Sequence, residues 1–244
     1  MVNGVCGEGD DSGMRLARTA IITFGLISLL GDIIYEGARS SVPTFLAVLA
    51  TPAIIVGLAI GLGEFLGYSL RLVSGYIADT TRAYWSLTIV GYALIISIPL
   101  LAFADWRLAI ILIILERVGK AIRTPARDTL ISVTTKAMGT GKAFGLHELL
   151  DQIGATVGPL IMAATIYIMS KQGVSSEIQL RTAFMILFIP YIILLIILSY
   201  GYTKMKGPVA KAFGTMKMEK QQEELPKSFY YYSIAVGLNT AGLF

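Results

Sequence analysis

Apolar stretches long enough to cross a bilayer recur along most of this chain, separated by short polar turns. They cover residues 20–50, 53–78 and 86–104, a stretch that begins at Leu108, and residues 143–169 and 182–202. A transmembrane helix needs about 20 mostly apolar residues, so the pattern predicts six of them over residues 20–202. The first stretch contains the polar run GDIIYEGARSSVP but continues into further apolar residues, which favours one long helix.

The segments outside this predicted bundle have a different character. Residues 1–19 begin with an acidic, glycine-rich run, unlike a cleaved signal peptide, and are expected to be a cytoplasmic N-terminal segment. The lysine-rich residues 203–227 predict a basic cytoplasmic linker. Residues 228–244 begin like a seventh transmembrane helix but stop short of the ~20 residues that a crossing needs. The chain is therefore expected to be either a fragment or a half-size protein whose units pair.

Composition supports an integral membrane protein and excludes several other classes. The chain is 55% hydrophobic and only 15% charged, whereas soluble domains are about 45–50% apolar and about 25% charged. Its single cysteine, Cys6, and single histidine, His147, leave no intramolecular disulfide and no histidine-built metal site. The run HELLD at residues 147–151 lacks the second histidine of a zinc protease, and no nucleophile elbow or phosphate loop occurs. Neither an enzyme, nor a metal or cofactor, nor nucleic acid binding is expected.

The fourth stretch is the least apolar, and charge along the chain tests whether it spans. With six helices and a cytoplasmic N-terminus, the outside loops hold only Arg107, Lys171 and Arg181. The remaining loop and tail cations then lie inside, as the positive-inside rule requires: Arg15, Arg18, Arg82, Lys136, Lys142, Lys204, Lys206, Lys211, Lys217, Lys220 and Lys227. Removing the fourth helix would put the lysines after Tyr202 outside, so we expect six spans in the cell membrane.

Charged side chains occur inside four of the six stretches. Each costs about 2.5–3.5 kcal/mol at the centre of a lipid-facing helix. On a wheel of about 100° per residue, the charges of residues 116–128 fall within roughly 140° and those of residues 32–39 within about 60°. They are therefore expected to line a shared polar interior. The expected cavity wall is Asp32, Glu36, Arg39, Glu64, Arg71, Glu116, Arg117, Lys120 and Asp151.

The third and sixth stretches carry no charge and are expected to sit outside, against lipid. The charges thus repeat as two triplets, each with two charged stretches and one clean one. Two triplets of opposite orientation are the inverted-repeat plan of secondary transporters. The fold expected is an all-α integral membrane domain of six helices, built from two inverted three-helix repeats, with a partial seventh helix.

Three motifs make the chain resemble the N-terminal half of a major facilitator superfamily transporter. The loop after the second stretch, GYIADTTRAYW, is similar to the family's gate signature through Gly75 and Asp79, while Arg82 stands where a glycine is usual. RVGKAIRTPARD, from Arg117, looks like the fourth-helix motif. GLHELLDQIGATVGPLI resembles the fifth-helix element through its packing and kink residues Gly154, Gly158 and Pro159. The resemblance implies a cytoplasmic gate at Gly75, Asp79 and Arg82.

The function expected from this resemblance is secondary active transport of a small solute by alternating access. Asp32 and Glu36, an acidic pair one helical turn apart, are the expected proton-exchange groups, with an ion gradient as the energy source. The expected partners are the lipid bilayer, the solute, and a C-terminal six-helix half or a second half-unit.

Several alternatives remain at this point. Arg117, Lys120 and Arg123 recur every third residue, as in a voltage-sensing module, which gating-charge measurements would distinguish from solute flux. The four cations Arg117, Lys120, Arg123 and Arg127 are expected either to hold an anionic substrate or to form salt bridges with Asp151, Glu148 and Glu64. Of these, Arg123 and Arg127 are interpreted as structural residues that snorkel near the cytoplasmic end, where Pro125 would kink or end the helix. The glycines of GLAIGLGEFLG are interpreted as helix-packing positions: Gly57, Gly61, Gly63 and Gly67.

Overall fold

The computed structural model describes residues 8–219, 227–228, 230–232 and 235 of the chain. Throughout these residues the regular structure is helical. The helices are α1 (Glu8–Val48), α2 (Ala53–Thr81), α3 (Tyr84–Ala93), α4 (Trp106–Thr134), α5 (Thr140–Lys171), α6 (Ser176–Ile186) and α7 (Phe188–Glu219), with 3-10 segments η1 (Leu94–Ser97), η2 (Pro99–Phe103) and η3 (Lys136–Met138). The chain divides into two compact units, residues 1–209 and 210–244, and the first is described below.

The six predicted stretches all form helical segments of membrane-crossing length. Five are also apolar enough to cross by composition: Gly13–Val48, Ala53–Thr81, Tyr84–Phe103, Thr140–Lys171 and Ser176–Phe213. The remaining stretch, the fourth, forms α4. This helix is as long as α2, 29 residues or about 43 Å, but it carries more charge. The prediction of an all-α membrane fold is confirmed.

Several helix boundaries differ from those expected. α4 runs past Pro125 to Thr134, so of the two outcomes expected at this proline, a kink or a helix end, the helix end is excluded. The third span changes to 3-10 turns from Leu94, where Pro99 supplies no N–H for the helical ladder. The sixth span consists of α6 and the start of α7, joined at Leu187. α7 continues to Glu219, through much of the segment expected to be a linker. Most of the expected seventh helix lies outside the described residues.

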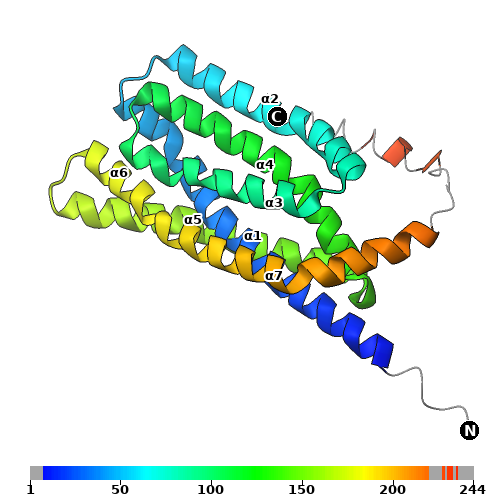
Figure 1. Ribbon diagram of the computed structural model, residues 1–244. Coiled ribbons are helices and arrows are strands. Elements are labelled where there is room, and N and C mark those ends of the chain that lie inside the picture. Colours follow the sequence, from blue (N-terminus) through cyan, green and yellow to red (C-terminus); the bar gives the residue numbers. More distant parts are fainter. Residues whose placement is uncertain (1–7, 220–226, 229, 233–234, 236–244) are drawn as a thin grey trace, which may run out of the picture. The chain divides into compact units, whose positions relative to one another are not determined.

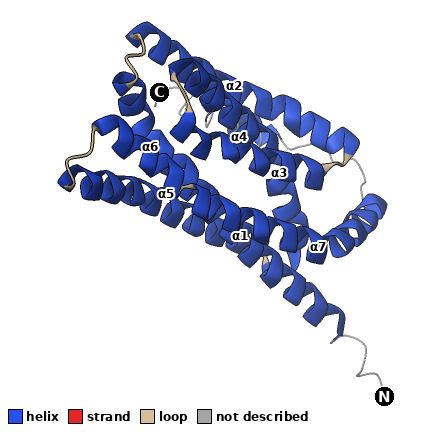
Figure 2. Ribbon diagram, turned by 60° about the vertical axis from the view of Figure 1, so that its left-hand side comes forward, coloured by secondary structure: helices blue, strands red, loops and turns tan. Residues whose placement is uncertain are grey.

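Helices of the two halves pack across one another. α1 lies along α5 and α4 lies along α2, so the first helix of each triplet packs on the second helix of the other. The third span packs on α4. α7 touches α1 at two places: Leu194 of α7 approaches Gly31 of α1, and Thr23 of α1 approaches Gly201 of α7, which Met205 of the same helix also approaches. Figures 1 and 2 both show α2, α4 and α3 side by side, with α5, α6 and the start of α7 beside α1. This exchange is what two inverted repeats produce.

Glycines permit the closest helix crossings. A side chain at Gly158 of α5 would meet the Ile33 carbonyl oxygen and the Gly37 nitrogen of α1, the latter at 2.8 Å. On the other side of the bundle, a Cβ at Gly119 of α4 would lie 3.1 Å from the Gly91 oxygen of α3. Small residues at such crossings let helix backbones approach closely. This packing holds the helices together, because lipid gives no hydrophobic drive for their association.

The glycines of α2 divide into two groups. Gly63 and Gly67 pack on the Arg117 side chain, where an added Cβ would lie 3.2 Å from Cγ and 3.9 Å from Cβ of that arginine, respectively. Gly57 and Gly61 have no neighbour within 4 Å among the described residues. The helix-packing interpretation therefore holds only for Gly63 and Gly67 within this part of the chain.

Apolar surface is distributed differently from the prediction. α2 and α5 bury the smallest share of the five apolar spans, less than the third and sixth spans. Large exposed apolar side chains on these two helices are Leu58, Leu62, Phe65, Leu72, Tyr76, Leu149, Leu160, Tyr167 and Ile168. The clean third and sixth spans are therefore not the most outward-facing ones, because they pack on α4 and α1.

The glycine crossings give a prediction with opposite signs at two positions. Gly158→Ala should destabilise the purified chain in detergent by about 1–3 kcal/mol, because its methyl group would overlap the α1 backbone. Gly57→Ala should leave stability unchanged or raise it by up to about 1 kcal/mol, since alanine is the better helix former. Thermal unfolding of both variants measures the difference, and an equal effect at the two sites would contradict the described α1–α5 crossing.

Candidate functional site

A polar cavity of about 260 Å³ lies inside the first unit. Five helices supply its walls: Ser28, Gly31 and Asp32 from α1, Arg71 from α2, Tyr92 from α3, Lys120, Arg123, Thr124 and Arg127 from α4, and Asp151 from α5. Ligand pockets are typically ~300–1,000 Å³, so this cavity lies just below that range and has room for a small molecule or part of one. The third span contributes Tyr92, so the prediction that only the other spans line the interior is wrong.

Helical periodicity explains why these side chains converge. Residues three and four apart lie on one helix face. Ser28, Gly31 and Asp32 follow this spacing on α1, and residues 120, 123, 124 and 127 follow it on α4. On the outer side of α4, Ile111 is 61% exposed. The charge arc predicted from the sequence is thus the inward face of this helix.

The two arginines interpreted as snorkelling residues are turned inward instead. Arg123 is 3% exposed. Its guanidinium lies 3.7 Å from the Glu116 carboxylate and 5.1 Å from the centre of the Tyr92 ring. Arg127 donates hydrogen bonds to the Ser28 hydroxyl and the Asp128 carboxylate, both at 2.9 Å. The snorkelling interpretation is wrong because α4 continues beyond Pro125, which leaves both side chains within the packed bundle.

A second group of charges lies beside the cavity, on α2 and α4. Arg117 forms a 3.0 Å ion pair with Glu64 and approaches Glu116 at 3.9 Å. It also donates a hydrogen bond to the Tyr35 hydroxyl. The Tyr35 ring lies 3.5 Å from the Lys120 ammonium and 4.8 Å from the Arg117 guanidinium. This tyrosine therefore separates the two cations and contacts both.

On the α5 side, Asp151 is paired within its own helix. Its carboxylate oxygen Oδ1 lies 3.2 Å from Nδ1 of His147, one turn earlier, and both side chains are largely buried. Nε2 of the histidine has no hydrogen-bond partner among the described residues. Asp151 Oδ1 likewise has no hydrogen-bond partner there, so His147 is a close neighbour of this carboxylate at the cavity wall.

Close packing also fixes the position of Asp32. A side chain at Gly154 of α5 would meet the Leu29 carbonyl oxygen and lie 3.1 Å from the Asp32 Cβ. Gly154 therefore lets α5 approach α1 at the level of this carboxylate. Pro159 lies within α5, which continues past it to Lys171.

The expected cavity wall is only partly assembled. The structure brings Asp32, Arg71, Lys120 and Asp151 to the cavity, and Glu64, Glu116 and Arg117 to the neighbouring charge group. Glu36 and Arg39 instead pair with each other at 3.6 Å, with side chains 26% and 50% exposed, and neither lines the cavity.

The sequence analysis missed Ser28, Tyr35, Tyr92 and Thr124. Ser28 lies one turn before Asp32 and Thr124 one turn after Lys120, so extending the helical wheel to uncharged polar residues would have found both. The third span carries no charge from which to draw a face. No signal in the sequence therefore pointed to Tyr92.

The residues of the expected gate lie at the end of α2. The Tyr84 hydroxyl donates a 3.1 Å hydrogen bond to Asp79, joining α2 to α3. A Cβ at Gly75 would lie 3.6 Å from the Pro125 Cβ, so this end of α2 sits against α4. Arg82 ends α2 with φ +56°, a left-handed conformation that costs an L residue about 1–2 kcal/mol. Glycine adopts it freely, which explains why glycine is usual at this place.

Comparison with known proteins shows what the chain is similar to. The profile of the Major Facilitator Superfamily matches residues 24–229. An uncharacterized protein of Mycobacterium tuberculosis (strain ATCC 25618 / H37Rv) is 46% identical over 151 residues, which are 61% of this chain and 37% of that protein. An uncharacterized MFS-type transporter of Methanocaldococcus jannaschii is 30% identical over 153 residues, 62% of this chain and 38% of that protein.

A third relative carries a more specific name. Multidrug resistance protein MdtH of Photorhabdus laumondii is 32% identical over 123 residues, 48% of this chain and 29% of that protein. The matched region thus covers little more than a third of the first relatives' length. No solved structure matches the chain.

The buried pair of Glu116 and Arg123 gives a prediction about stability. Arg123→Met should lower the free energy of unfolding by about 3–5 kcal/mol, because it removes the nearer of the two arginines beside the buried Glu116 carboxylate and leaves only Arg117, 3.9 Å away. Adding Glu116→Gln should recover much of this loss, since the poorly compensated charge is then removed. Chemical unfolding of the purified chain in detergent measures both effects.

The matched control is Arg39→Met, which breaks an ion pair whose arginine is half exposed. Exposed pairs contribute about 0–1 kcal/mol, so this variant should unfold almost as the wild type does. Equal losses for Arg123→Met and Arg39→Met would show that the buried pair has no special part in stability.

Proposed function

Because the chain belongs to the Major Facilitator Superfamily, we propose that it forms the N-terminal half of a secondary transporter that moves a small solute across the cell membrane. Family membership supports membrane transport, and the helices make this a multi-pass membrane protein. The observation that carries the proposal is the cavity, on which charged side chains from four helices converge.

Stability alone does not require such a cavity. A bundle of this size is stable with apolar helix interfaces, as the glycine crossings illustrate. Charged residues within a membrane bundle are costly and are kept where they bind solutes or move protons. A cavity of about 260 Å³ with several ionisable walls therefore supports a solute site better than a structural ion cluster.

Alternating access requires a second bundle that rocks against this one around the solute. The exposed apolar faces of α2 and α5 offer the surface for it, either a C-terminal six-helix half or a second half-unit. The gate at Gly75, Asp79 and Arg82 would then close the site at the end of α2 where α3 begins. The bilayer would cover the remaining outer surface.

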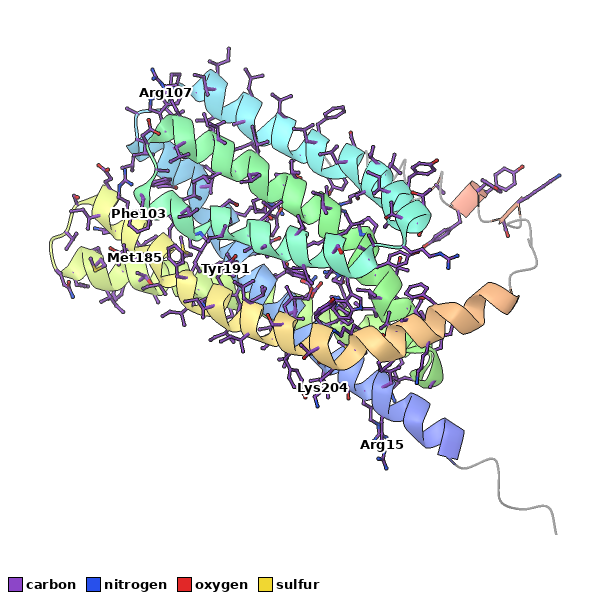
Figure 3. The ribbon with its side chains drawn as sticks, viewed as in Figure 1. Arg15, Phe103, Arg107, Met185, Tyr191 and Lys204 are labelled. Carbon is purple, nitrogen blue, oxygen red and sulfur yellow. The ribbon has the colours of Figure 1, made fainter. Side chains whose placement is uncertain are left out.

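Charge at the helix ends supports a cytoplasmic N-terminus. Figure 3 shows Arg107 at one end of the bundle, with Arg15 and Lys204 towards the opposite end. Arg82 and Lys136 follow α2 and α4, whose ends lie on the same side as the start of α1 (Figure 1). Cations gather on the cytoplasmic side of membrane proteins, so the end with Arg15 would face the cytoplasm.

Energy would come from an ion gradient, with Asp32 as the proton-exchange group. Its carboxylate lines the cavity, and among the described residues no lysine, arginine or histidine forms an ion pair with it within 4.0 Å. A carboxylate without a fixed partner can bind and release a proton as the cavity opens to either side. Glu36, the other expected proton carrier, pairs with Arg39 outside the cavity. Asp32 is therefore the one residue of the expected acidic pair to which we assign proton exchange.

The voltage-sensor alternative has little support. The α4 cations that suggested it are held in place: Arg117 by Glu64 and Tyr35, and Arg123 by Glu116. α4 is also packed between α2 and α3, with glycine crossings on the α3 side. Such a helix is not free to translate under a membrane potential.

The proton role is tested in vesicles that contain the complete protein and an imposed pH gradient. Uptake is first screened with labelled sugars, organic anions, amines and drugs to find a transported solute. Asp32→Asn should then abolish gradient-driven uptake by removing the proton carrier while leaving expression intact. Glu36→Gln is the matched control and should keep most of the uptake.

Two results would contradict this proposal at different levels. An unchanged pH dependence in Asp32→Asn would remove the proton role of this residue. Absence of flux for every solute class, in vesicles whose protein is folded and correctly inserted, would contradict transport itself.

A further inference from the structure

The cavity carries more positive than negative side chains. Its walls include four cationic residues and two acidic ones. The cationic residues are Arg71, Lys120, Arg123 and Arg127, and the acidic ones are Asp32 and Asp151. The sequence alone showed a near-even mixture of acids and bases, because it could not tell which of them share a cavity.

Two of these cations already have partners outside the cavity lining. Arg123 approaches Glu116 at 3.7 Å, and Arg127 pairs with Asp128 at 2.9 Å. Their charge is therefore compensated by acids on α4 itself. Arg71 and Lys120 remain, and they share the cavity with the two carboxylates of Asp32 and Asp151, so these four side chains carry no net charge.

Arg71 and Lys120 have no acidic partner in the part of the chain that the structure describes. Neither forms an ion pair within 4.0 Å. The Arg71 Nε is buried and has no hydrogen-bond acceptor there. Arg71 lies 4.9 Å from the Tyr68 ring centre and Lys120 lies 3.5 Å from that of Tyr35. Both cations rest on aromatic rings and keep donors available at the cavity.

An aromatic ring is an incomplete substitute for an anion. A buried donor without an acceptor is costly, and a cation inside a membrane bundle is more so. An oxyanion would satisfy both groups at once, since a guanidinium binds a carboxylate or phosphate through two parallel hydrogen bonds and an ammonium adds a point charge. A cationic solute offers no acceptor to the buried Arg71 Nε, whereas an oxyanion does.

We propose that the solute of this cavity is a small organic oxyanion, a carboxylate or a phosphate ester, held between Arg71 of α2 and Lys120 of α4. This assignment rests on the proposed transport function and names its substrate class. The two cations come from helices of different repeats, so the bound anion bridges the halves of the bundle. The cavity of about 260 Å³ limits the part of the solute held here to a small group.

The site is tested by ligand-dependent thermal unfolding of the full chain in detergent at constant ionic strength. The probes are succinate, inorganic phosphate, and the four-carbon diamine putrescine. A ligand that binds only the folded state raises the melting temperature in a saturable way. Succinate, phosphate or both should raise it by several degrees, and putrescine should not. The succinate and phosphate arms show which oxyanion is preferred.

Variants separate the site from a general salt effect. Arg71→Gln and Lys120→Gln should each reduce the anion-dependent shift at least severalfold, and Arg71→Lys should keep part of it. Lys171→Gln, at the exposed end of α5, is the control with the same loss of charge and should keep the full shift. If Arg71→Gln does not fold, the Arg71→Lys and Lys120→Gln pair carries the test.

The outcomes distinguish this inference from the transport proposal. Stabilisation by putrescine alone, by neither anion, or equally in all four variants would overturn the anion site. Vesicle uptake of a neutral or cationic solute, with no anion-dependent shift, would leave transport standing and remove the anion assignment. A site-dependent anion shift without flux of any solute would keep the site and remove transport.

Discussion

The low polarity of hydrocarbon is the constraint on which this structure depends. An ion facing lipid loses its hydration and gains no partner, so charged residues in membrane helices turn towards one another or towards water. α4 shows the result: Glu116 and Arg123 are almost fully buried, while Ile111 of the same helix is 61% exposed. The side that would be polar in a soluble amphipathic helix is the buried side here. The cavity and its charges follow from this inversion.

Close glycine crossings make that arrangement possible. Ionic side chains occupy the interior only if the helices around them pack without large apolar residues between them. Gly154 and Gly158 bring α5 onto α1 beside Asp32, and Gly63 and Gly67 leave room on α2 for the Arg117 side chain. The same small residues therefore position the site and hold the bundle. In both cases the glycines lie on the second helix of one triplet and face the first helix of the other, so the α1–α5 and α4–α2 contacts are built alike.

The sequence was most informative where a single physical cost dominates. Hydropathy and loop charge were enough to predict the helices, including α4, and the helical wheel predicted the inward face of that helix. The sequence could not show which charges reach the cavity: Glu36 and Arg39 share a helix face with Asp32, yet they pair with each other outside the cavity. Arg123 and Arg127 were misplaced because the cytoplasmic end of the helix was expected near Pro125, as a kink or a stop, whereas a packed helix tolerates a proline inside it. Tyr92 could not be predicted as a cavity residue from the positions of charges, because it is uncharged and lies on a span without charged residues.

The charged face of α4 borders a polar cavity, and we expect its opposite face to border lipid. Cys6 is the only cysteine, so a Cys6→Ser background allows single cysteines to be placed at Thr124, which lines the cavity, and at Leu115, on the outer side. A membrane-impermeant thiol reagent added to open vesicles should modify Thr124→Cys and leave Leu115→Cys unreacted. Reaction at Leu115→Cys with protection at Thr124→Cys would contradict the account.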